Sequence, residues 1–101
     1  MTSEESSTVD VIIKSWYRGF NGFSGTFSDG IKTMPFYFDR ANIEYKDQEG
    51  LVPVIFQDSV NTNKRIKMDV EFCMDAGHFD VKWIEYVMDG TSYEIGNLGS
   101  L

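Results

Sequence analysis

The most unusual stretch of the chain is Trp16-Tyr17-Arg18-Gly19-Phe20-Asn21-Gly22-Phe23-Ser24-Gly25-Thr26-Phe27. It holds five aromatic side chains and three glycines, and Arg18 carries its only charge. Aromatic rings on a glycine-rich backbone are typical of a shallow platform on which the bases of single-stranded nucleic acid stack. The same composition also fits a hairpin whose rings fill a hydrophobic core, so both interpretations stay open.

Length and composition predict one globular domain made mainly of sheet. The chain has 101 residues, of which 42% are apolar and 25% charged, and this is an ordinary globular composition. Phenylalanine occurs eight times and leucine three times. An abundance of Phe, Val and Ile over Leu favours strands over helices.

Hydrophobic alternation predicts five strands, over residues 9–17, 20–28, 33–38, 65–74 and 79–87. The clearest is 65–74, where apolar and polar residues alternate throughout. The first also fits a helical stripe, but its β-branched residues favour a strand. Residues 39–63 form a long connection, in which Leu51–Phe56 is predicted to be a further strand or a packed loop.

The predicted domain spans residues 9–90, with a flexible acidic arm at 1–8 and a C-terminal tail at 91–101. Five strands with a long connection between the third and fourth predict an all-β fold. The expected architecture is a small five-stranded Greek-key barrel of the OB type.

Within that barrel, several motifs resemble the bacterial-type cold-shock domain. Trp16-Tyr17 is similar to the Trp-Phe that ends the family's first strand, and Asn21–Thr26 to its Lys-Gly-Phe-Gly-Phe-Ile motif. Asp29-Gly30 followed by Met34–Phe38 resembles the next turn and strand, and the likeness covers residues 9–88. Asn21 replaces the motif lysine, and Gly25 replaces its second aromatic. The resemblance implies a non-catalytic protein that binds single-stranded RNA or DNA.

On this interpretation, aromatic side chains form the stacking surface and basic side chains meet the phosphates. The expected stacking residues are Trp16, Phe23, Phe27, Phe36 and Phe38. The expected phosphate contacts are Lys14, Arg18 and Lys32. No catalytic residue, metal site or cofactor is expected, because no catalytic or phosphate-loop motif is present.

The charge distribution supports a second hypothesis. The net charge is −7, yet residues 12–46 hold five basic and three acidic side chains, so the acidic excess lies elsewhere. An acidic protein-binding module, or a small inhibitor that binds a basic surface of a partner protein, would have such a balance. The single cysteine and the polar N-terminus predict a cytoplasmic protein without a membrane segment.

Overall fold

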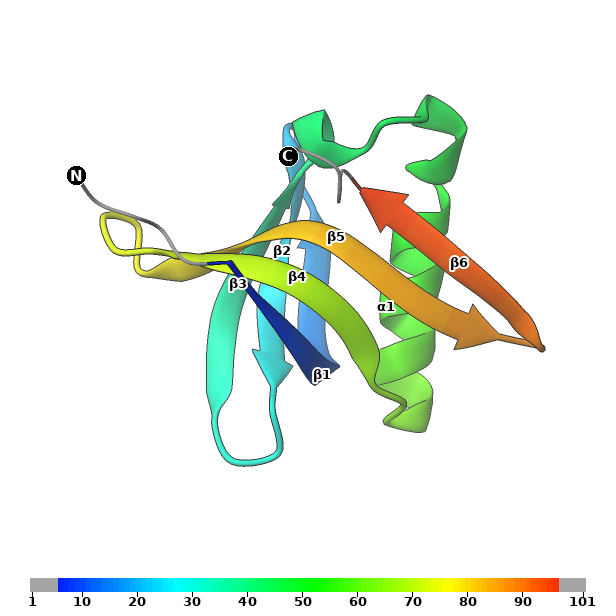
Figure 1. Cartoon of the computed structure of the whole chain (residues 1–101), viewed down its shortest axis with the longest axis horizontal. Coiled ribbons are helices and arrows are strands. Elements are labelled where there is room, and N and C mark those ends of the chain that lie inside the picture. The colour runs from blue at the N-terminus through cyan, green and yellow to red at the C-terminus, as the bar shows by residue number, and fades with distance from the viewer. Residues whose placement is uncertain (1–5, 97–101) are drawn as a thin grey trace.

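The computed structural model describes residues 6–96, and in it five strands close into a β-barrel (Figure 1). The strands are β1 (Ser6–Arg18), β2 (Gly22–Ser28), β3 (Thr33–Asp39), β4 (Ile66–Cys73), β5 (His78–Met88) and β6 (Thr91–Gly96). Their order in the sheet is β3-β2-β1-β4-β5-β6, and a short parallel pairing of β3 with β5 closes the barrel. The predicted all-β fold, a small OB-like barrel of five strands, is confirmed.

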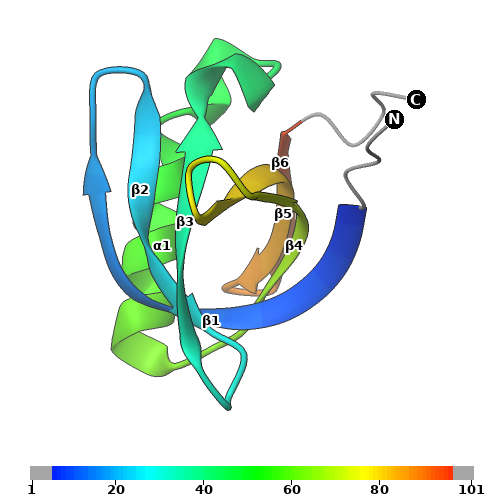
Figure 2. The same ribbon diagram turned by 90° about the vertical axis from the view of Figure 1, so that its left-hand side faces the viewer.

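The long strand β1 joins the two halves of the barrel. Residues 6–11 pair with β4, and residues 12–18 pair with β2. Between Ile13 and Ser15 the register with β2 shifts, so Lys14 is the extra residue of a β-bulge. A bulge bends and twists a strand, and Figure 2 shows β1 curving round the barrel.

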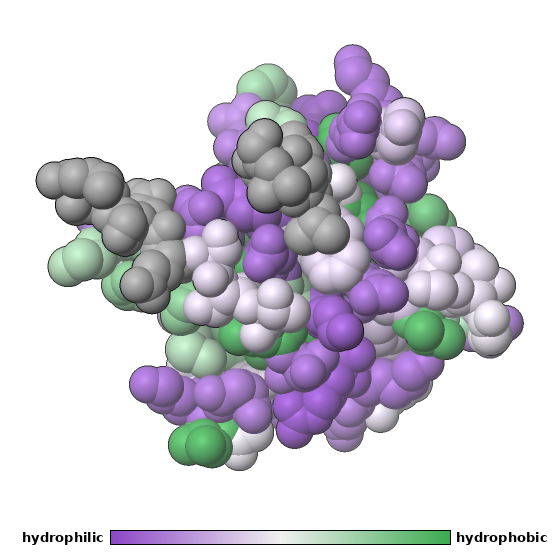
Figure 3. Space-filling model, in the orientation of Figure 1, coloured by the Kyte–Doolittle hydropathy of each residue, from purple (hydrophilic) through white to green (hydrophobic). Residues whose placement is uncertain are grey.

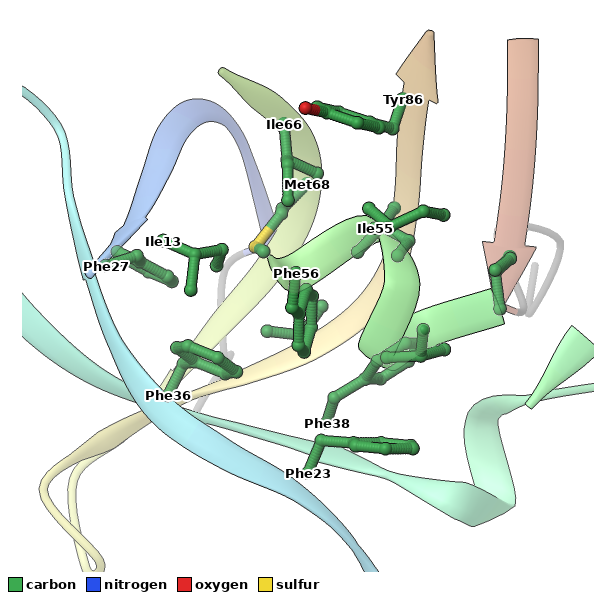
Figure 4. Close-up of a cluster of buried hydrophobic side chains, with 14 of the residues drawn as sticks. Ile13, Phe23, Phe27, Phe36, Phe38, Ile55, Phe56, Ile66, Met68 and Tyr86 are labelled. Carbon is green, nitrogen blue, oxygen red and sulfur yellow. The ribbon is translucent and has the colours of Figure 1, made fainter. Parts of the chain in front are cut away.

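Phenylalanine side chains fill much of the interior. Alternation along β2 turns Phe23 and Phe27 inward, and alternation along β3 does the same for Phe36 and Phe38. Figure 4 shows these rings among aliphatic side chains from the other elements. The largest buried side chains include Ile13, Phe23, Phe27, Phe36, Phe38, Ile55, Phe56, Ile66, Met68 and Tyr86.

The connection between β3 and β4 contains a helix, α1 (Leu51–Thr62), preceded by short 3₁₀ turns η1 (Arg40–Asn42) and η2 (Lys46–Gln48). The prediction of a strand or loop over Leu51–Phe56 is therefore wrong. The buried residues Val52, Ile55, Phe56 and Ser59 follow helical spacing, a pattern masked by the β-branched run. Pro53 is tolerated because it lies in the first turn, where backbone N–H groups have no partner within the helix.

Helix α1 is fixed to the bulge of β1 by Ser59. The Ser59 hydroxyl is fully buried, accepts a hydrogen bond from the backbone N–H of Ile13 at 3.1 Å, and donates to the carbonyl of Lys64 at 2.7 Å. One side chain thereby satisfies a donor at the bulge and an acceptor after the helix.

The predicted domain, residues 9–90, is too short at both ends, because the strands extend from residue 6 to residue 96. Residues 6–8 belong to β1 and not to an arm, because they pair with residues 69–71 of β4. Residues 91–96 form β6, which pairs with β5 across a turn at Asp89-Gly90. The remainder of the predicted arm and tail, residues 1–5 and 97–101, lies outside the described residues.

We predict that Ser59→Ala lowers the free energy of unfolding by about 1–3 kcal/mol, because it leaves the buried N–H of Ile13 without a partner. Urea denaturation measures the change. Thr62→Ala is the matched control, since its hydroxyl lies in the same helix but is exposed, and it should change stability by no more than about 0.5 kcal/mol. Equal effects of the two substitutions would contradict the anchoring role of Ser59.

Candidate nucleic-acid interface

Four of the five predicted stacking residues lie inside the barrel. Phe23, Phe27, Phe36 and Phe38 are at most 2% exposed, and Phe27 and Phe36 stack on each other with ring centroids 5.5 Å apart. A ring enclosed by other side chains has no face to offer a base. The prediction for these four residues is wrong, because a chain with few leucines needs its phenylalanines to fill the interior.

Trp16 is also turned away from the predicted surface. It pairs with Gly25 on the inward side, its ring packs against Phe56, and its indole N–H donates to the Gln57 side chain at 3.0 Å. A Cβ at residue 25 would lie 2.1 Å from the carbonyl oxygen of Ser15. The close approach of β1 and β2 therefore requires glycine at residue 25.

The predicted phosphate contacts are not gathered in one place. Lys14 is exposed on the bulge of β1. Arg18 lies near the start of β2, over the ring of Phe23 and paired with Glu49. Lys32 lies beyond the other end of β2, in the turn that precedes β3. Lys32 is therefore about 20 Å from Arg18, the length of a seven-residue strand.

The outer face of β1, β2 and β3 carries a different aromatic group. Strand pairing places Tyr17 beside Ser24, and Ser24 beside Tyr37, in one row across the three strands. Tyr17 is 65% exposed and Tyr37 is partly exposed. Two strand separations put their Cα atoms about 10 Å apart. The small Ser24 side chain leaves the space between the two rings open.

The hydroxyl of Tyr37 lies beside Gly22 of β2. A Cβ at that position would come within 3.0 Å of the Tyr37 hydroxyl oxygen. Burial raises the pKa of this hydroxyl, and the negative charge of Asp39 raises it further. The phenol is therefore uncharged at neutral pH and adds no repulsion toward an anionic ligand.

His78 extends the aromatic row onto β5. Its ring centroid lies 6.0 Å from that of Tyr37, and its Nε2 atom is hydrogen-bonded to the Asp80 carboxylate at 3.0 Å. The pairing of Tyr37 with Asp80 where β3 meets β5 brings these residues together. We name the surface formed by Tyr17, Ser24, Tyr37 and His78 the tyrosine face.

Two loops flank the tyrosine face, and Figure 2 looks onto the strands that carry it. The loop between β1 and β2 presents Phe20, which is 89% exposed, and the loop between β4 and β5 presents the exposed Met74. OB barrels bind oligonucleotides on the surface of strands 2 and 3 between these two loops. The tyrosine face therefore occupies the position at which this fold presents ligand-binding residues.

The sequence contained a usable indication of this face. Once the phenylalanines of β3 are assigned to the interior, alternation puts Tyr37 outside, and its neighbours across the strands follow. The bulge at Lys14 changes which residues of β1 face outward after it, so Tyr17 and not Trp16 is exposed. His78 is the first residue of β5.

Comparisons of the chain with protein-family models, with curated proteins and with solved structures found no match. Within residues 6–96, no three His, Cys, Asp or Glu side chains are grouped so as to hold a metal ion. In the same part of the chain, no helix has the length and apolar character needed to cross a membrane.

We predict that Phe23→Ala lowers the free energy of unfolding by about 3–5 kcal/mol, because the substitution empties a fully buried site. Tyr17→Ala should change it by no more than about 1 kcal/mol, because this ring is largely exposed. Thermal or urea denaturation of both variants measures the difference. If Tyr17→Ala were the more destabilising substitution, the assignment of the two rings to the interior and the surface would be wrong.

Proposed function

We propose that this protein binds single-stranded nucleic acid, RNA or DNA, without catalysis, by stacking bases on the tyrosine face. The observation that carries the proposal is the outward-facing row of Tyr17 on β1, Ser24 on β2 and Tyr37 on β3, continued by His78 on β5, on the face of an OB-like barrel that includes strands 2 and 3. The function expected from the sequence is thus kept, with other residues in the stacking role.

Stacking supplies most of the binding energy in this proposal. A base on an aromatic side chain contributes about 1–3 kcal/mol, and every base offers a flat π surface. Tyr17 and Tyr37 together can hold two bases, and Phe20 and His78 lie where a third would follow. Binding is therefore expected to tolerate many sequences and to need bases that are not paired.

Electrostatic attraction contributes little. Asp39 and Asp80 lie beside Tyr37, and the basic residues nearest to the face are Lys14, Arg18 and Arg40. For single strands, log K falls with log salt at a slope of about 0.7 for each phosphate neutralised. A strand that meets two or three of these cations would show a slope of only about 1.5–2.

A second candidate function is supported by the outer surface of β4, which adjoins the tyrosine face at Asp80. Strand pairing groups acidic side chains on the outer surface of β4 and its neighbours, with Lys67 among them. Figure 3, which shows the molecule from this side, shows a mainly hydrophilic surface with apolar residues in separate small areas. A basic protein surface would be attracted here and a nucleic acid repelled. We name this surface the acidic side. Its carboxylates are Asp10, Asp69, Glu71 and Glu85, and Asp80 lies at its border with the tyrosine face.

We predict that Tyr17→Ala and Tyr37→Ala each weaken binding of a fluorescein-labelled oligouridylate by about 5- to 150-fold, the equivalent of one lost stacked base. Tyr37→Phe should bind like the wild type, because it keeps the ring. Tyr45→Ala serves as the control, since Tyr45 is an exposed tyrosine outside the tyrosine face. Fluorescence anisotropy at low salt gives the affinities.

Absence of binding by the wild type at low salt would contradict the nucleic-acid proposal. Capture of a basic protein that is lost on charge reversal of Asp69 and Glu71 would favour the second candidate instead. If the alanine variants bound as tightly as the wild type, the tyrosine face would not be the binding surface.

A further inference from the structure

A hollow of about 340 Å³ lies at the end of the tyrosine face. One wall is Asn21, in the loop between β1 and β2, and the rest comes from the segment that follows β3. The lining residues are Asn21, Asp39, Arg40, Ala41, Ile43, Lys46 and Glu49.

Glu49 holds two arginines at this hollow. One of its carboxylate oxygens lies 3.1 Å from Nη2 of Arg18 and 3.1 Å from Nε of Arg40. The Glu49 side chain is only 15% exposed, whereas those of Arg18 and Arg40 are 56% and 47% exposed. Burial acts to raise the pKa of Glu49, but the hydrogen bond from Arg18 and the charge of Arg40 outweigh it and lower that pKa. The carboxylate therefore stays ionised and keeps both guanidinium groups in place.

Arg40 has a donor left for a ligand. Its Nε bonds to Glu49 and its Nη1 donates to the carbonyl oxygen of Phe20 at 3.1 Å, which fixes the loop between β1 and β2. Among the described residues, no hydrogen bond or ion pair involves its Nη2 atom. A guanidinium held at two positions with a third donor exposed is suited to an oxyanion such as phosphate.

The charged side chains in and beside the hollow leave a cation in excess. Lys46 adds a third cation whose side chain is exposed. Of the two acids, Glu49 is neutralised by the arginines, and Asp39 accepts a hydrogen bond from the backbone N–H of Ala41 at 2.9 Å. The lining itself holds two cations and two carboxylates, and Arg18, which pairs with Glu49 from beside the hollow, gives an excess of one cation.

The hollow also lies at a suitable distance from the bases. Gly22 pairs with Asp39, and this pair is two residues along the strands from the pair of Ser24 and Tyr37. Two residues of a strand span about 7 Å. The sugar-phosphate of a nucleotide whose base stacks on Tyr37 can cover such a distance.

We propose that this hollow binds one backbone phosphate of the single strand that lies on the tyrosine face, with Arg40 and Lys46 as its contacts. The inference rests on the proposed function and adds to it a fixed point for the strand. Arg18 acts through Glu49 by holding that carboxylate in position.

The test is the salt dependence of binding to a short oligothymidylate. The variant with both Arg40→Gln and Lys46→Gln should lower affinity about tenfold at low salt. It should also reduce the slope of log K against log salt by about 0.7, the value for one phosphate on a single strand. Lys46→Gln alone should give part of both effects, and Lys46 makes no contact that holds the loops together among the described residues. Lys67→Gln, a charge removal on the acidic side, should leave the slope unchanged.

The outcomes separate the two proposals. If the wild type binds the oligothymidylate but the double variant keeps its slope, the phosphate site is wrong and the stacking proposal stands. If the wild type does not bind, both proposals fail.

A separate NMR experiment tests whether the phosphate bound in the hollow belongs to a nucleic-acid strand. Oligothymidylate should shift the amide resonances of Asn21 and Arg40 at concentrations where inorganic phosphate leaves them unmoved, and equal shifts by inorganic phosphate would overturn the assignment to a strand.

Discussion

The packing of the barrel interior is the constraint on which the rest of this structure depends. Five strands that close into a barrel enclose a space that side chains must fill. In a chain with three leucines, phenylalanine has to fill it. Phe56 of α1 lies at the centre, with its ring centroid 5.4 Å from that of Phe36 and 6.2 Å from that of Phe23. The helix is therefore part of the core, and its insertion decides which aromatic residues remain for the surface.

On the outer face of β1 and β3, the aromatic side chains that remain are tyrosines, Tyr17 and Tyr37. Tyrosine can lie on a solvated sheet because its hydroxyl reaches water while its ring stays available for stacking. The glycines near these rings have specific roles. Gly22 leaves room for the Tyr37 phenol, and Gly25 lets two strands approach closely. The glycine-rich stretch thus contributes Phe23 and Phe27 to the core and Tyr17 to the outer surface.

The sequence predicted the strands well and their faces poorly. Hydrophobic alternation located all five barrel strands, because every second side chain of a half-buried strand points into the core and is apolar. Alternation could not assign Trp16 to a face, because the bulge at Lys14 changes which residues of β1 point inward after it. It could not assign Phe23 either, because the inner face of β2 is known only once the strands are seen to close into a barrel. The helix was missed because Val52, Val54 and Ile55 favour strands locally, and packing of Phe56 and Ser59 overrides that preference. The predicted stacking residues were wrong because a high aromatic content does not distinguish core side chains from surface side chains.

The two sides of the barrel differ in a way that would orient a ligand. Tyrosines and the arginine pair at Glu49 lie on and beside β2 and β3, whereas carboxylates cover the outer surface of β4. The carboxylates of β4 would repel a single strand, and under the proposed function the strand lies on the first surface. The net charge of −7 is therefore compatible with the proposed function, because Asp10, Asp69, Glu71 and Glu85 lie on the outer surface of β4 and its neighbours and not on the tyrosine face.

The central claim is that single strands bind on the tyrosine face, and NMR shift mapping with a short oligouridylate tests it most directly. The account predicts that the largest changes occur at the amides of Tyr17, Ser24 and Tyr37 and at the ring of His78, while Asp69 and Glu71 on the acidic side do not move. Shifts centred on β4, or an unchanged spectrum at low salt, would contradict it.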